Sequence, residues 1–426
     1  MKKIKITTAI FLSLLFILFA VGSGNSSGGG SNGGYNGGQE SVVNGGGDET
    51  SIENVILSCG DLLDFSDGYA FVEEGEDYHS YYIINTDGDI VGYTDRYCHY
   101  SKFSNGLAIT REPAVVIDYT GAELDLGLDD TMTPCLITSD GNILVSQAKD
   151  TGDGYSYALG VVSKYGEWVC SLVDLPFSGD PDDYRFYYED LGENVYSMNI
   201  YYYMDNSAYG QSIEEQFIFN ADNGKYISIY EDASESTISN FMNGKAVLCL
   251  SVNDSKYDHQ IVSLKKSDFS KTVLGTAKKA EITRQDGEEV FYYQDSTKAG
   301  YYDTDFSLIF DATGINASFG EYYDGYVCAN LSNYNGKRCL AIYNMSGEYA
   351  FEPVEIADCD FVFGDGGVIG YEAPDGTVTY IDVTGDECIS FDMSQSDEIN
   401  KLCICGNDLV SDKQHYYDVN TGELRF

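Results

Sequence analysis

The sequence is poor in basic residues. It contains 24 Lys and Arg against 69 Asp and Glu in 426 residues, which gives a formal net charge of −45. Nucleic-acid binding depends on neutralising phosphates with Lys and Arg, so this balance argues against a nucleic-acid partner. It also argues against attraction to anionic membrane surfaces. The charge fits a soluble secreted protein, or one with cationic partners or Ca²⁺.

Recognisable catalytic motifs are lacking as well. The sequence has no nucleophile elbow, P-loop, His-Glu-x-x-His or dinucleotide fingerprint. Paired carboxylates could serve a glycosidase, but among 69 acidic residues no pair is distinguished from the others. We therefore expect that the chain is not an enzyme, and we assign no catalytic and no cofactor-binding residues.

Metal-binding patterns are weak. Asp is dense at 118–130, 150–153 and 180–183, but Ca²⁺ needs six to eight oxygen ligands and none of these runs has the order of an EF-hand loop. Cys403 and Cys405 lie two residues apart, which is not the spacing of a zinc site. The 11 Cys are an odd number and cannot form a complete disulfide framework. We assign no metal ligands and no cofactor, with Ca²⁺ kept as the alternative.

The N-terminal residues predict export. Residues 1–22 have three lysines, a short apolar run and small residues near the end, as a signal peptide has. Ser23 stands where a lipoprotein would carry its acylated Cys, so we expect no lipid anchor. Residues 23–51 are rich in Gly, Ser and Asn and are expected to be a flexible linker. We expect a secreted or cell-envelope protein that touches a membrane only if residues 1–22 stay uncleaved.

Residues 52–426 contain a repeated unit and are expected to form a single domain, because no second linker interrupts them. Each unit begins with an aromatic residue and has a Gly three positions later, before an apolar strand. The anchors that carry this pattern are Phe65 with Gly68, Phe103 with Gly106, Phe241 with Gly244, Tyr322 with Gly325, and Phe363 with Gly366. Weaker copies carry Gly141, Gly192, Gly287 and Gly406. The nine glycines recur about every 42 residues.

A period of this length with several strands per unit is typical of a repeat array of small sheets. One small sheet cannot bury both faces, so neighbouring sheets supply the missing surface. We predict an all-β fold, namely a closed β-propeller of about 7–9 small antiparallel sheets. Residues 52–58 would then pair with the C-terminal segment and remove the open edge. An open, curved β-solenoid is the alternative.

The repeat resembles that of bacterial WG-repeat proteins, whose unit runs aromatic-x-x-Gly-x-Ala-x-Val and then Trp-Gly-Tyr-Ile-Asp-x-x-Gly. Residues 159–169, with Gly166 as a further anchor, match the second half best, and residues 82–88 match it as well. The chain departs from the pattern because it has no Trp-Gly dipeptide and Trp168 is its only Trp. The resemblance implies an all-β repeat fold and a binding or scaffolding role, without shared catalytic residues.

Tyrosine is abundant, with 37 residues, many of them in pairs. Neighbours on a strand point to opposite faces, so one Tyr of each pair can fill a sheet interface while the other reaches the surface. We expect a monomeric, non-enzymatic binding or scaffold module that presents loops and Tyr on one rim to a protein or polysaccharide. The long loops at 174–190 and 201–216 are the expected contact segments. A carbohydrate-active hydrolase on a propeller and a purely structural envelope protein are the alternatives.

Overall fold

Short strands dominate the fold, because runs of β-branched and aromatic residues alternate with turns that contain Gly. The computed structural model describes residues 63–73, 80–99, 101–152, 154–202, 213–229, 236–252, 258–285, 289–357, 361–394, 402–406, 408–412 and 415–426. Within these ranges the strands form nine antiparallel sheets of two to four strands, and there is no α-helix. The prediction of an all-β fold with about 7–9 small antiparallel sheets is confirmed.

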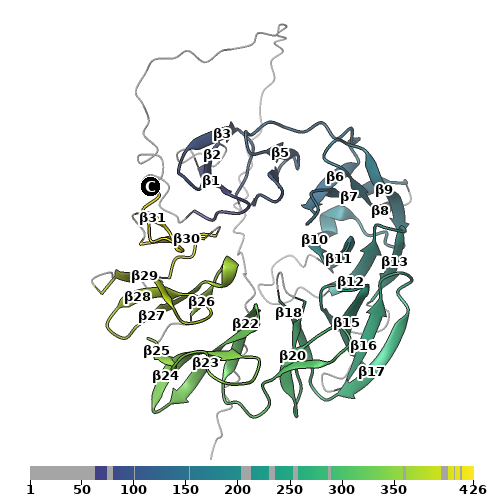
Figure 1. The fold of residues 1–426 in the computed structure, drawn as a ribbon. Coiled ribbons are helices and arrows are strands. Elements are labelled where there is room, and N and C mark those ends of the chain that lie inside the picture. The colour runs from purple at the N-terminus through teal and green to yellow at the C-terminus, as the bar shows by residue number, and fades with distance from the viewer. Residues whose placement is uncertain are drawn as a thin grey trace, which may run out of the picture. The chain divides into compact units, whose positions relative to one another are not determined.

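We number the sheets 1 to 9 in chain order (Figure 1). Sheet 1 contains β1 (Tyr69–Glu73), β2 (Tyr81–Asn85) and β3 (Ile90–Thr94), and sheet 2 contains β4 (Leu107–Ile109) and β5 (Val116–Asp118). Sheet 3 contains β6 (Met132–Ile137), β7 (Ile143–Asp150), β8 (Tyr155–Val162) and β9 (Trp168–Leu175). Sheet 4 contains β10 (Tyr184–Asp190), β11 (Val195–Tyr202), β12 (Ile213–Asn220) and β13 (Lys225–Ser228).

Sheet 5 contains β14 (Ser236–Ile238), β15 (Lys245–Ser251), β16 (His259–Lys265) and β17 (Lys271–Ala277). Sheet 6 contains β18 (Glu281–Arg284), β19 (Phe291–Gln294), β20 (Ala299–Tyr302) and β21 (Leu308–Asp311). Sheet 7 contains β22 (Ser318–Tyr323), β23 (Tyr326–Tyr334), β24 (Lys337–Asn344) and β25 (Val354–Glu355). Sheet 8 contains β26 (Val362–Phe363), β27 (Ile369–Glu372), β28 (Thr377–Ile381) and β29 (Glu387–Asp392), and sheet 9 contains β30 (Leu409–Ser411) and β31 (Tyr416–Asp418). The 3₁₀ turns Pro181–Asp183 and Asp365–Gly367 are the helical elements of the described residues.

Strands that are consecutive in the sequence are neighbours in every sheet, so each unit of the repeat forms one sheet. The structure places one of the nine anchor glycines with each sheet, apart from Gly287, which lies outside the described residues. The other eight have φ between 72° and 83°, a left-handed conformation that Gly adopts without strain. Gly166, with φ 78°, lies in the turn between β8 and β9. Phe65, Phe103 and Phe241 are buried, and Phe363 is half-buried.

The core consists of nine hydrophobic clusters, each shared by two sheets. Eight of them join sheets that follow one another in the chain. The ninth joins sheet 1 to sheet 9, since Phe65 and Val72 pack with Leu409 and Tyr416. Both faces of a sheet are therefore covered by its neighbours, as the sequence argument for stacked small sheets requires.

The predicted closing strand at residues 52–58 lies outside the described residues, as do the predicted signal peptide and linker. The sheets group into one compact unit. In the part of the chain that is described, no helix has the length and apolar character needed to cross a bilayer.

Candidate functional site

A pocket of about 470 Å³ lies between sheets 4 and 5. Three turns line it, namely the β12–β13 turn, the anchor turn before β15 and the β16–β17 turn. We call it the lysine pocket, and its residues are Asn220, Asp222, Asn223, Asn243, Gly244, Lys245, Lys265, Lys266 and Ser267. The pocket thus combines side chains that are up to 47 positions apart in the sequence.

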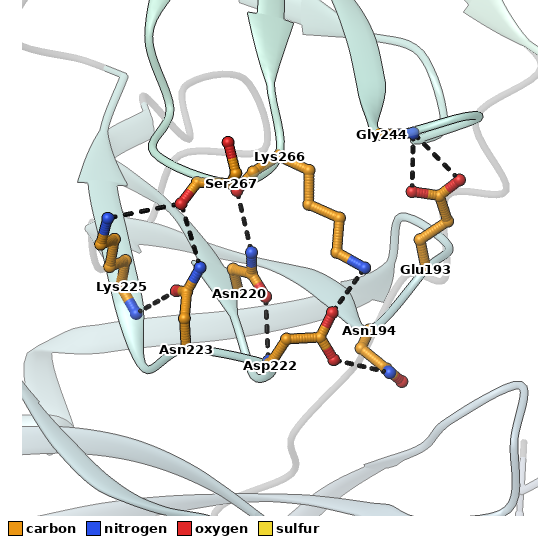
Figure 2. A network of polar contacts seen from close by, with 9 residues as sticks. All are labelled: Glu193, Asn194, Asn220, Asp222, Asn223, Lys225, Gly244, Lys266 and Ser267. Carbon is orange, nitrogen blue, oxygen red and sulfur yellow. Dashed lines mark hydrogen bonds and ion pairs between the residues drawn. The ribbon is translucent and has the colours of Figure 1, made fainter.

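Side-chain amides fix the walls of the lysine pocket (Figure 2). Asn220 Nδ2 donates to the carbonyl oxygen of Lys266 at 2.9 Å, and Asn223 Nδ2 donates to that of Ser267 at 3.1 Å. At the anchor turn, the Gly244 N–H donates to both carboxylate oxygens of Glu193, at 3.0 and 3.2 Å. Sheet 4 therefore contacts two turns of sheet 5 through hydrogen bonds to their backbone groups.

The lysine pocket concentrates positive charge in a strongly acidic chain. Lys266 Nζ lies 2.6 Å from Asp222 Oδ2, and Lys245 pairs with Asp305. Burial raises the pKa of Asp222, but the hydrogen bonds from Lys266 and Asn194 outweigh it, so the pKa is lowered overall. Lys265 has no ion pair among the described residues. The ammonium group of Lys265 is therefore what the pocket offers to the oxygens of a small anion.

A second pocket, of about 580 Å³, lies between sheets 2 and 3. We call it the aliphatic–acidic pocket, and it is lined by Ala114, Val115, Val116, Glu123, Leu124, Asp125, Leu126, Gly127, Leu128, Asp129, Asp130, Met132 and Pro134. Its lining combines aliphatic side chains with four acidic residues, so it offers apolar and charged surface in similar amounts.

The chain after β5 builds this second pocket. It folds back along β5, since the Leu124 N–H donates to the Val116 carbonyl at 2.8 Å. Leu126 reaches the core and is 6% exposed, while Asp125 and Asp129 stay exposed. The hydroxyl and N–H of Thr131 donate to Asp129 Oδ1 at 2.6 and 2.9 Å and lower its pKa. This acid therefore keeps its negative charge, which is the opposite of what a general acid requires.

The sequence reasoning considered these acids only as Ca²⁺ ligands and missed the pocket. In the described part of the chain no three His, Cys, Asp or Glu residues are close enough together to hold a metal ion. The signal that could have revealed the pocket is the alternation from 123 to 129, where acids or Gly separate Leu124, Leu126 and Leu128. Such alternation gives an extended segment one apolar and one polar face.

The contact segment predicted as a loop at 174–190 is a loop only in part, because Tyr184–Asp190 forms strand β10. Its aromatic side chains pack on one another. Phe177 lies 5.0 Å from Tyr184, ring centre to ring centre, in an edge-to-face arrangement. Tyr184 lies 5.4 Å from Tyr202, and Tyr187 lies 5.2 Å from Tyr201. The register of β10 and β11 puts Tyr187 and Tyr201 on one face of sheet 4 and Phe177, Tyr184 and Tyr202 on the other, toward sheet 3. We call Tyr187 and Tyr201 the aromatic ledge. Tyr187 is 50% exposed, so a ring face of the ledge is open to a ligand. Of the second loop, 201–216, residues 203–212 lie outside the described part.

Acidic residues lie near the aromatic side chains on the other face of sheet 4, around Phe177 and Tyr184. Tyr155, at the start of β8, has its pKa raised first by Asp180 and then by burial and by Asp150 and Asp182. The expectation that one Tyr of each pair reaches the surface is wrong at Tyr301 and Tyr302, which are 0% and 6% exposed. Sheet 6 is covered on both faces by sheets 5 and 7, so neither side chain has a free face.

The thiols lie in unreactive surroundings. The nine cysteines in the described residues form no disulfide with one another. Burial raises the pKa of Cys98 to about 12 and, with the charge of Asp412, that of Cys403 to about 11. A nucleophilic Cys needs a lowered pKa, so the seven buried cysteines act as small apolar core residues.

No family model matches the chain, and no curated protein is similar to it. Several solved structures resemble it at low identity. The Dos1 propeller is 12% identical, with a TM-score of 0.36 over 78% of this chain and 91% of that one. BamB from Moraxella catarrhalis is 12% identical, with a TM-score of 0.32 over 76% of this chain and 84% of that one. A post-proline cleaving enzyme from Rickettsia typhi is 9% identical, with a TM-score of 0.40 over 79% of this chain and 54% of that one. At these identities and TM-scores, similarity indicates nothing about what this chain binds or does.

Proposed function

We propose that the chain is an exported, non-enzymatic binding or scaffold module of the WG-repeat type, and that its aromatic ledge contacts a protein or polysaccharide ligand. The observation that carries the proposal is the exposed ring of Tyr187, held edge-to-face on Tyr201. Tyr offers a flat apolar face with few rotatable bonds and a hydroxyl, which suits sugar rings and protein surfaces alike.

We further propose that the nine sheets close into a propeller. The support is the junction of sheets 1 and 9, where the Phe65 N–H donates to the Cys405 carbonyl at 2.6 Å. The Phe241 N–H makes the same bond to Leu191 at the junction of sheets 4 and 5, also at 2.6 Å. A closed scaffold would hold the ledge rigidly and leave no open sheet edge.

The test is binding by the wild-type protein and by Tyr187→Ala, with Tyr165→Ala as the matched control because Tyr165 is 76% exposed and lies away from the ledge. Soluble polysaccharides cast in native gels and an array of extracellular proteins are the probes. We expect Tyr187→Ala to weaken binding at least tenfold, as for an interface hot spot, and Tyr165→Ala to have no effect. Equal binding by both variants would exclude the ledge, and release of oligosaccharides from a bound polysaccharide would exclude the non-enzymatic role.

A further inference from the structure

We propose that the aliphatic–acidic pocket binds an extended segment of a partner protein in which Lys or Arg alternates with aliphatic residues. This proposal concerns a site other than the aromatic ledge and does not depend on it. Three observations carry it: the apolar floor of the pocket, the uncompensated acids around it, and the short sheet beside it.

The floor of the pocket is aliphatic. Val116 and Leu126 are 1% and 6% exposed and belong to the cluster shared by sheets 2 and 3. Leu124, Leu128 and Met132 pack against this cluster but remain partly exposed. A ligand that covers them removes apolar surface from water, so part of it must be apolar too.

The rim of the pocket is negative. Glu123 is paired with Arg96 at 2.6 Å, whereas Asp125, Asp129 and Asp130 have no ion pair among the described residues. The bonds that the structure shows for Asp125 and Asp129 use only one oxygen of each, since Oδ1 of Asp125 accepts from the Gly127 N–H and Oδ1 of Asp129 accepts from Thr131. The second oxygens can accept from an ammonium or guanidinium group. Charge complementarity therefore selects a cationic occupant.

Sheet 2 is the reason to expect a peptide strand there. It has two strands, whereas sheets 3 to 8 have four each. After β5 the chain makes only a short return along that strand, through the bond from the Asp118 N–H to the Ala122 carbonyl and that from the Leu124 N–H to Val116. Residues 123–125 of the returning segment are thus the outer edge of this short sheet, whereas the Leu126 carbonyl lies against Gly166 of sheet 3. An extended peptide can pair with such an edge and place alternate side chains on the floor and toward the rim.

The experiment measures binding to the full chain by titration calorimetry at low and moderate salt. The probe is a ten-residue peptide of alternating Val and Lys. A Val and Glu peptide tests the charge, a Ser and Lys peptide tests the apolar floor, and hexylamine tests whether a small cation suffices. We expect the Val and Lys peptide to bind at least tenfold more tightly than the other three, and more weakly as salt increases.

The rim is tested with the double variant Asp129→Asn, Asp130→Asn, in which the new amide at position 129 keeps an oxygen acceptor for Thr131. The matched control is Asp386→Asn, Glu387→Gln, which changes the net charge equally at exposed positions elsewhere. We expect the rim variant to lose about tenfold in affinity for the Val and Lys peptide and the control to lose less than twofold. Leu128→Ala should weaken the same peptide by removing part of the floor.

Several outcomes would overturn the proposal. Equal losses in the rim variant and in the control would mean that the chain attracts cations only through its net charge. Equal affinity for hexylamine would mean that the pocket takes a small cation and no strand. Equal affinity for the Val and Glu peptide, or no binding of the Val and Lys peptide, would remove the cationic segment as the occupant.

Discussion

The junction of sheets 4 and 5 and the junction of sheets 9 and 1 share one type of backbone hydrogen bond. They differ in the strands and turns that surround it. In each, the N–H of a buried Phe donates to a carbonyl of the neighbouring sheet at 2.6 Å, Phe241 to Leu191 and Phe65 to Cys405. The first pair is 50 positions apart, and the second is 340 positions apart. The repeated aromatic-x-x-Gly unit therefore forms this hydrogen bond whether its two residues are near or far apart in the sequence.

The surroundings differ because the sheets differ in size. Sheets 4 and 5 have four strands each, and the turns between these strands supply the amides and lysines of the lysine pocket (Figure 2). Sheet 9 has two strands, and the C-terminal residue packs where further strands would be: the Phe426 ring lies 4.7 Å from that of Tyr416 and 6.2 Å from that of Phe65. The hydrogen bond from the anchor Phe therefore joins the sheets, whereas the outer strands and turns create the candidate sites.

The largest expected effect comes from removing the anchor ring at each junction. Phe65→Ala and Phe241→Ala should each lower the free energy of unfolding by about 3–5 kcal/mol, because both side chains are 2% exposed and their loss leaves a cavity. If the sheets close into one cooperative unit, both variants shift a single thermal transition by similar amounts. Differential scanning calorimetry measures this, with Tyr165→Ala as the exposed control. A Phe65→Ala protein that unfolds like wild type would show that the junction of sheets 9 and 1 does not contribute to the fold.

A smaller effect is expected from one hydroxyl. The Leu63 N–H donates to the buried hydroxyl oxygen of Tyr416 at 3.0 Å, so Tyr416→Phe leaves a buried donor without its partner. We expect a loss of about 1–3 kcal/mol in the free energy of unfolding, measured by urea titration. Tyr380→Phe is the matched variant inside the repeat, since the Tyr380 hydroxyl accepts the Cys403 N–H at 2.8 Å between sheets 8 and 9. A loss at Tyr380 without one at Tyr416 would contradict closure.

Much of the fold could be predicted from the sequence because it depends on local rules. A Gly in a left-handed turn and an aromatic residue three positions before it recur visibly, and they led to nine units where the structure has nine sheets. Gly141 and Gly192 were found only by spacing, because no aromatic residue stands three positions before either of them. The anchor pattern therefore tolerates loss of its ring where the turn itself is kept.

The candidate sites could be predicted only in part, because they depend on which turns meet across two sheets. Lys245 and Asp305 are 60 positions apart and meet only in the folded chain. The segment 174–190 was identified by its length as an insertion, although Tyr184–Asp190 is strand β10. The sequence does not tell that Tyr187 stays exposed while Tyr196 on the next strand is 1% exposed. Tyr196 faces the cluster between sheets 3 and 4, which no local pattern reveals.

The smallest expected effect distinguishes the two junctions by pH. Asp418 has its pKa lowered chiefly by the hydrogen bond from Arg425. Burial alone would raise the pKa of Asp222, but the hydrogen bonds from Lys266 and Asn194 lower it overall. A carboxyl with a lowered pKa in the folded state stabilises the fold above its unfolded pKa of about 3.9, and this stabilisation is lost as the pH falls through the folded value.

Asp418→Asn and Asp222→Asn should therefore each lose less stability than the wild type between about pH 5 and pH 3. The Asp418 side chain is 15% exposed and that of Asp222 is 47% exposed, so water screens the Asp222 pair more and Asp418→Asn should flatten the pH dependence more. Urea midpoints across this range measure the difference. A larger flattening in Asp222→Asn would mean that the lysine network, and not the C-terminal contact of sheet 9, contributes more to the acid sensitivity of the fold.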